Sequence, residues 1–114
     1  RLVVVLGHSL CGAIQATLEE LGRPSHHKSR NLRSIVERIQ PAIEPLFATE
    51  LAREPAALLR QSIRANIRAS VNQLRHGSDV LEQLIRADEL IIVGAEYSLE
   101  TGVVEFFEGV PVTR

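Results

Sequence analysis

Hydrophobic positions along this chain fall first into a short continuous run and then into helical spacing. Residues 2–6 form an apolar run rich in β-branched side chains and are followed by Gly7, a pattern that predicts a buried strand. Apolar residues at helical spacing continue over residues 11–21, and Gly22 followed by Pro24 predicts the end of that helix. The N-terminal pattern therefore predicts a strand–turn–helix unit, which is half of a β–α–β crossover.

The next apolar periodicity follows a polar, basic stretch. Residues 25–30 predict a loop, and Asn31 is a candidate N-cap for a helix over residues 31–46. Two prolines lie inside that helix, and they predict a kink or a restart near Gln40 because proline removes a backbone donor and crowds the preceding turn.

A longer helix and a short one follow. The third helix is predicted to begin near Pro55, since proline suits a first turn, and to end at His76-Gly77. Ser78 or Asp79 is a candidate cap for a short helix through Ala87. The arginines of the third helix lie mainly off its apolar stripe, which favours either a solvated face or a contact with a partner subunit: Arg60, Arg64, Arg68 and Arg75.

The C-terminal part returns to strand patterns. Residues 90–95 predict a second buried strand, residues 97–102 have turn chemistry, and residues 103–107 predict a last strand. The fold class is therefore α/β, with a mostly parallel sheet of three strands flanked by three to four helices. Because the first two strands are expected to be buried on both faces, they call for neighbouring strands. We thus expect residues 1–114 to be a single, incomplete domain whose N-terminal strands are missing.

Composition narrows the function classes. The chain has 114 residues, 45% of them hydrophobic, which suits one folded domain. A net charge of -1 argues against a nucleic-acid partner, and no apolar run approaches the roughly 20 residues of a membrane span. A single cysteine excludes an intrachain disulfide, and no signal peptide is visible, so we expect a cytoplasmic location. The sequence contains no methionine, which favours a chain that starts inside a larger domain.

The candidate chemistry lies at the first strand–helix turn. His8 ends the predicted strand and Cys11 begins the helix, so both side chains could approach one point at the usual ligand-binding end of a sheet. An imidazole nitrogen and a thiolate sulfur are a zinc-type ligand pair, and a helix N-terminus stabilises a thiolate. A buried, inert cysteine and a thiol nucleophile with His8 as base are the alternatives. Further possible ligands, more typical of solvated positions, are His26, His27 and His76.

Three stretches together resemble the β-class carbonic anhydrases. The segment Val4–Ala13, which contains His8-Ser9-Leu10-Cys11-Gly12, resembles the second zinc motif of that family. Ser98 departs from the family pattern, in which aspartate is commonest. The two later stretches that resemble family segments are Ala65-Asn66-Ile67 with Val71 and Leu74, and Ile92–Val104.

The resemblance implies a zinc enzyme that hydrates carbon dioxide reversibly to bicarbonate. Family members bind zinc through two cysteines, one histidine and an aspartate or a water, and His8 and Cys11 match the second pair. Gly12 matches the glycine beside the ligand cysteine, where the backbone passes close to the metal pocket. The resemblance also implies a homo-oligomer, a dimer or larger, with active sites near subunit interfaces.

One part of the family pattern is missing. The first motif, Cys-x-Asp-x-Arg, has no match in this chain, so the catalytic Asp-Arg pair is absent and only half of the zinc site is present. We therefore expect the isolated chain to be inactive and the complete protein to be a carbonic anhydrase. The alternative is a non-catalytic carbonic-anhydrase-like interaction or regulatory module, for instance one fused to an anion transporter. A redox-active thiol at Cys11 is a third interpretation.

Overall fold

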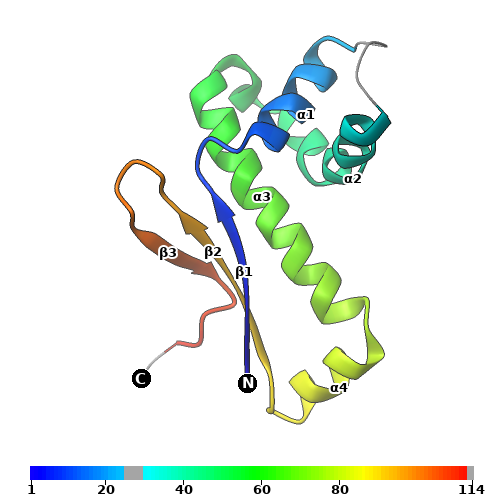
Figure 1. The fold of residues 1–114 in the computed structure, drawn as a ribbon, viewed down its shortest axis with the longest axis vertical. Helices are drawn as coiled ribbons and strands as arrows, with labels where there is room; N and C mark the ends of the chain where they lie inside the picture. The colour runs from blue at the N-terminus through cyan, green and yellow to red at the C-terminus, as the bar shows by residue number, and fades with distance from the viewer. Residues whose placement is uncertain (25–29, 113–114) are drawn as a thin grey trace. The chain divides into compact units, whose positions relative to one another are not determined.

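Two strands from opposite ends of the chain lie side by side, and four α-helices occur between them in sequence (Figure 1). The computed structural model describes residues 1–24 and 30–112. Its elements are β1 (Leu2–His8), α1 (Gly12–Gly22), α2 (Arg30–Phe47), the 3-10 helix η1 (Glu50–Arg53), α3 (Pro55–His76), α4 (Asp79–Arg86), β2 (Ile91–Tyr97) and β3 (Val104–Glu108). The α/β class predicted from the sequence is confirmed.

The chain divides into two compact units. The first contains Arg1–Ser9 and the residues from Ile67 onwards, and the second contains Leu10–Asn66, so α3 runs through both. This division does not test the expectation of one incomplete domain over residues 1–114, which stays a prediction.

The first unit carries a three-stranded sheet in the order β1-β2-β3. β1 pairs with β2 in parallel, from Leu2 opposite Ile91 to His8 opposite Tyr97. β3 pairs with β2 antiparallel, with a register shift near the middle of β2. The parallel pair completes the predicted crossover, whereas the last strand returns as a hairpin because its short connection cannot make a crossover.

Helix α3 packs closely against β2 in this unit. A Cβ atom at Gly94 would lie 2.9 Å from Cγ2 of Ile67 and 3.3 Å from Cγ2 of Val71. Both of these helix residues are buried, as is Ile92 on the strand. The missing side chain at Gly94 therefore lets the helix approach the sheet.

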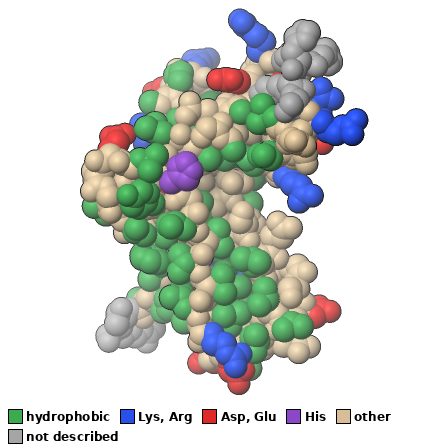
Figure 2. Space-filling view, in the orientation of Figure 1, with side chains coloured by type: hydrophobic (Ala, Val, Ile, Leu, Met, Phe, Trp, Pro, Cys, Tyr) green, Lys and Arg blue, Asp and Glu red, His purple; other side chains and the backbone are tan. Residues whose placement is uncertain are grey.

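The opposite face of β1 is open. Leu2, Val4 and Leu6 alternate along the strand and are 62%, 40% and 56% exposed. Figure 2 shows hydrophobic side chains gathered over the strands. The prediction of burial on both faces is wrong for β1, because among the described residues its only strand neighbour is β2 and one of its faces is uncovered. For β2 the prediction holds, since residues 92–95 are buried.

The second unit is built from helices. Thr17 is fully buried, and its Oγ1 donates a hydrogen bond of 2.8 Å to the carbonyl oxygen of Ala13, which satisfies the hydroxyl inside α1. The apolar side chains buried in this unit are Ile14, Val36, Ile39, Ile43, Leu58 and Ile63.

Helix α2 differs from its prediction at two points. It begins at Arg30, so Asn31 lies inside the helix and is not its N-cap. It also runs without interruption past both prolines, so of the predicted kink or restart near Gln40 the restart is wrong, and the kink stays a prediction. Ile39 and Ile43, one on each side of the first proline, are both buried. Their burial stabilises a continuous helix at the cost of the backbone hydrogen bonds that proline removes.

The boundaries of α3 and α4 match the predicted signals. Pro55 is the first residue of α3, and the helix ends at His76. The hydroxyl of Ser78 caps α4 by accepting a 3.4 Å hydrogen bond from the backbone N–H of Leu81. None of the helices in residues 1–24 and 30–112 is both long and apolar enough to cross a membrane.

Candidate metal centre

His8 is the last residue of β1 and lies opposite Tyr97 in the parallel register. Its Nδ1 atom lies 2.9 Å from the backbone carbonyl oxygen of Ser9. A carbonyl oxygen only accepts hydrogen bonds, so Nδ1 must carry the proton in this contact. In the neutral imidazole the lone pair is then on Nε2, which is the atom left to bind a metal ion.

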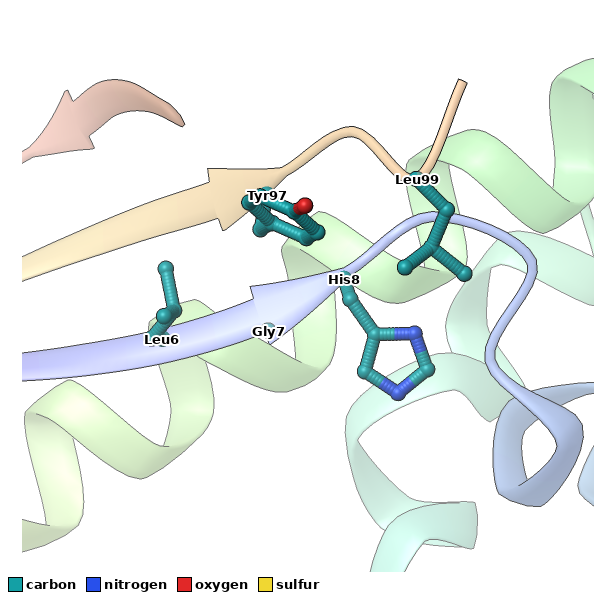
Figure 3. Close-up of a pocket in the computed structure, with 5 residues that line it drawn as sticks. All are labelled: Leu6, Gly7, His8, Tyr97 and Leu99. Carbon is teal, nitrogen blue, oxygen red and sulfur yellow. The ribbon is translucent and has the colours of Figure 1, made fainter. Parts of the chain in front are cut away.

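A cavity of about 300 Å³ lies beside this histidine in the first unit. Its lining comes from the end of β1 and from β2 with the turn that follows it: Leu6, Gly7, His8, Tyr97 and Leu99 (Figure 3). Apart from the imidazole and the tyrosine hydroxyl, the lining is apolar: the Tyr97 ring, two leucine side chains and a glycine. The cavity therefore suits a small uncharged molecule better than an ion.

Tyr97 and Leu99 line this cavity, but the sequence pattern indicated only turn chemistry for residues 97–102. The parallel register is the feature that places Tyr97 opposite His8, and a pairing register between distant strands is not visible in a local motif.

Cys11 occupies the N-cap position of α1 in the second unit, with extended backbone angles of φ -60° and ψ 119°. Its thiol is free and half-buried. Its carbonyl oxygen accepts a 3.0 Å hydrogen bond from the N–H of Gln15. The predicted placement of Cys11 at the start of the helix is confirmed, and this placement puts the sulfur atom near the positive end of the helix dipole.

Leu10, just before this cysteine, has an unusual backbone conformation. Its φ is +56°, in the left-handed region that costs a non-glycine residue on the order of 1 kcal/mol or more. The side-chain amide of Gln15 donates a 3.1 Å hydrogen bond to the Leu10 carbonyl oxygen and helps to hold this turn.

Gly12 is the first residue of α1, and its φ is not in the left-handed region. A Cβ atom built there would meet nothing within 4 Å. The conformation and packing of the described residues therefore do not require glycine at this position, and a role for Gly12 beside a bound metal stays a prediction.

Three other histidines were further possible ligands. His26 and His27 lie outside the described residues, and His76 ends α3. Within residues 1–24 and 30–112, no three or more His, Cys, Asp or Glu side chains form a group that could hold a metal ion. The structure thus places His8 in the first unit and Cys11 in the second. That these two residues bind zinc stays a prediction.

Known proteins that resemble this chain are carbonic anhydrases. The family model described as carbonic anhydrase matches residues 1–104. A carbonic anhydrase of Mycolicibacterium smegmatis is 37% identical over 106 residues, which cover 91% of this chain and 48% of that protein. The chain therefore spans about half the length of this curated relative.

Solved structures agree on the fold. The β-carbonic anhydrase CcaA matches with a TM-score of 0.75 and 21% identity, over 99% of this chain and 52% of that one. A tetrameric β-carbonic anhydrase of Sordaria macrospora matches with a TM-score of 0.77 and 17% identity, over 93% and 51% of the two chains. With a family model that covers most of its residues, this chain belongs to the carbonic anhydrase family and has the fold of the β-class.

Proposed function

We propose that the complete protein catalyses the reversible hydration of carbon dioxide to bicarbonate, with zinc held in part by His8 and Cys11. The observation that carries the proposal is the state of the His8 ring. Its Nδ1 is engaged by a backbone carbonyl, so Nε2 is free at the carboxyl end of a parallel strand and beside an apolar cavity.

The donor types suit zinc. Imidazole nitrogen and thiolate sulfur are both common zinc ligands, but a stable site has three or four protein ligands. One or two further protein ligands are therefore needed beyond His8 and Cys11, and the described residues do not supply them. When bound, zinc would supply the Lewis acidity that makes a hydroxide nucleophile available near neutral pH.

The chain's own residues have separate tasks in this proposal. His8 presents the Nε2 lone pair, and Cys11 offers its sulfur atom at the start of α1. The apolar lining formed by Leu6 and Leu99 accommodates uncharged carbon dioxide.

Substitution of the two ligands tests this function. In the full-length protein we expect His8→Gln and Cys11→Ser each to lower zinc content and to reduce carbon dioxide hydration by at least a hundredfold. Zinc content is measured by elemental analysis and hydration by stopped flow with a pH indicator. Val80→Lys, at an exposed position on α4, is the control and should change neither. Full zinc content and activity in His8→Gln would contradict the proposal.

A non-catalytic module is the second candidate. It is favoured by the lack of a metal-binding group of three side chains among the described residues. The two candidates differ in one measurement: a module leaves the full-length protein without zinc and without hydration activity. We expect the 114-residue chain alone to bind zinc weakly and to show no appreciable hydration under either candidate.

A further inference from the structure

We propose that Ser9 is the positioning residue that fixes the tautomer and orientation of the His8 ring. The proposal rests on the proposed function only in the purpose it gives to that ring, which is to present Nε2 to a metal ion. The hydrogen bonds themselves are features of the metal-free chain.

Ser9 makes three hydrogen bonds within the first unit. Its backbone N–H donates to the carbonyl oxygen of Tyr97 at 2.9 Å. Its Oγ accepts from the backbone N–H of Leu99, also at 2.9 Å. Its carbonyl oxygen accepts from Nδ1 of His8 at 2.9 Å. Two of these bonds hold Ser9 against β2 and the turn that follows it. The third holds the imidazole of His8 against the Ser9 carbonyl.

The third bond decides which nitrogen is available. A neutral histidine that is free in water prefers its proton on Nε2, which would block that atom as a metal ligand. The hydrogen bond from Nδ1 to a fixed carbonyl reverses this preference, since the bond made by one ring nitrogen sets the proton on the other. Ser9 therefore selects the tautomer with a free Nε2.

The hydroxyl is needed because the carbonyl must be held in place. The Ser9 carbonyl belongs to the peptide that joins it to Leu10, whose φ of +56° is unfavourable for leucine. A peptide next to a strained residue relaxes when its other restraints are removed. The bond from Leu99 to Oγ is a restraint that alanine at position 9 would lack, whereas threonine would keep it.

The same two residues that hold Ser9 also line the cavity beside His8. Tyr97 and Leu99 contribute their backbone groups to Ser9 and their side chains to the cavity wall (Figure 3). The orientation of the ring and the shape of the cavity thus both depend on Tyr97 and Leu99. Removal of the Ser9 hydroxyl should change both together.

The test measures the tautomer without metal. In the full-length, zinc-free protein with ¹⁵N-labelled histidine, two-bond ¹H–¹⁵N correlation spectra at alkaline pH report which nitrogen of each neutral ring carries the proton. The His8 signal is assigned by its loss in His8→Gln. We expect the wild type to be protonated on Nδ1, Ser9→Ala to show a mixture of both tautomers, and Ser9→Thr to restore the wild-type pattern.

A matched control separates this role from general loosening of the turn. Ser98→Ala also removes a hydroxyl acceptor from the turn, since Ser98 Oγ accepts a 3.3 Å hydrogen bond from the N–H of Thr101. That hydroxyl does not bind Ser9, whose carbonyl oxygen contacts His8. We expect Ser98→Ala to keep the wild-type tautomer. Zinc affinity in the full-length protein should fall by about tenfold in Ser9→Ala, as is usual when a residue that orients a metal ligand is lost.

Three results would overturn the proposal: a wild type protonated on Nε2, an unchanged tautomer in Ser9→Ala, or an equal change in Ser98→Ala. Should Ser9→Ala fail to fold, a mixed tautomer in the folded Ser9→Thr protein would also overturn it. If the tautomers behave as expected but no variant alters zinc content, the positioning role of Ser9 stands and the proposed function fails.

Discussion

Gly94 is the residue at which β2 comes closest to α3. A Cβ atom there would lie within 3.3 Å of three atoms, on Ile67, Val71 and Glu108. Two of these neighbours are buried on a long helix, so they have little room to move. The position requires glycine for packing, and not for its backbone angles, since its φ is not in the left-handed region.

Substitution of this glycine should therefore destabilise the protein. We expect Gly94→Ala to lower the free energy of unfolding by about 1–3 kcal/mol through overpacking. Gly12→Ala is the matched control, because a Cβ there meets nothing within 4 Å, and its effect should stay within about 0.5 kcal/mol. Urea unfolding followed by circular dichroism measures both variants. Equal stability of the two would show that α3 shifts to accommodate the added methyl group.

For individual residues, the sequence predicted the position correctly where a local signal existed. His8 at a strand end, Pro55 in a first turn and Ser78 at a cap are each visible within a few positions, and the structure places all three as predicted. The role of Ser9 was not visible, because its hydroxyl partner is Leu99, 90 residues away. Contacts between distant segments depend on the register of β1 against β2, which no local pattern specifies.

At the scale of elements, helix α3 is joined to β3 by an arginine. The Arg75 guanidinium donates a 2.9 Å hydrogen bond to the carbonyl oxygen of Ile92 and lies 4.0 Å from a carboxylate oxygen of Glu108. Arg68 lies 4.0 Å from the same carboxylate, and its guanidinium carbon is 5.1 Å from the centre of the Phe107 ring. These two arginines were expected on a solvated or partner-facing surface. Both contact the sheet of their own chain; this corrects the expectation for Arg75, whose side chain is 26% exposed, whereas Arg68 stays 46% exposed.

The hydrogen bond to Ile92 should contribute more than the ion pairs do. Both ion pairs lie at the limit of close contact and are partly exposed, so solvent weakens them. We expect Arg75→Ala to destabilise the protein by about 1.5–3 kcal/mol, the usual range for a hydrogen bond to a charged group. Arg60→Ala, exposed on the same helix, should change stability by less than about 0.5 kcal/mol.

Thermal or urea unfolding compares these arginine variants. Added salt offers a further distinction: if the bond to the carbonyl dominates, the difference between wild type and Arg75→Ala should persist at high ionic strength. Loss of the difference in 1 M salt would assign the stabilisation to Glu108 instead.

Element boundaries were predictable where a local residue type determines them. The predictions were wrong where packing between elements determines the boundary. The ends of α3 and α4 follow from proline and serine. The continuity of α2 through two prolines depends on burial of Ile39 and Ile43 in the second unit, which outweighs the local penalty. The 3-10 helix η1 was missed. Its cap, Thr49 accepting a 3.2 Å hydrogen bond from Leu51, lies between two predicted helices where no periodicity is present.

At the scale of the whole molecule, a set of exposed apolar side chains on the outer strands β1 and β3 is the most prominent feature. Besides the exposed leucines and valine of β1, it includes Phe106 on β3, which is 51% exposed and lies opposite Ala95 in the register. Soluble proteins seldom leave contiguous apolar area of this kind in water. This feature fits both expectations drawn from the sequence, which are neighbouring strands of the same domain and a homo-oligomer. The Sordaria relative is described as tetrameric, and the number of subunits here is a matter for measurement.

Self-association is therefore expected for the 114-residue chain. We expect sedimentation velocity to give an average mass that rises with concentration above 12.6 kDa. Val4→Lys combined with Phe106→Lys should shift the chain toward monomer, because both positions belong to this exposed apolar set and charge there opposes burial. Val80→Lys, which is 68% exposed on α4, is the control and should leave the mass unchanged. A monomer at every concentration in the wild type would contradict this expectation.

The parallel pairing of β1 with β2 also has a consequence during synthesis. Ser9 and the residue that its hydroxyl binds are 90 residues apart, and every pair in the register of β1 has a similar separation. At about 5–20 residues per second, a ribosome needs roughly 5–20 s to make the partner strand after β1 has been translated. Throughout that interval the nascent apolar strand lacks β2, the strand that it pairs with in the structure. During that time we expect β1 to bind chaperones that recognise extended hydrophobic segments. Without such a chaperone, β1 is an early site of misassembly.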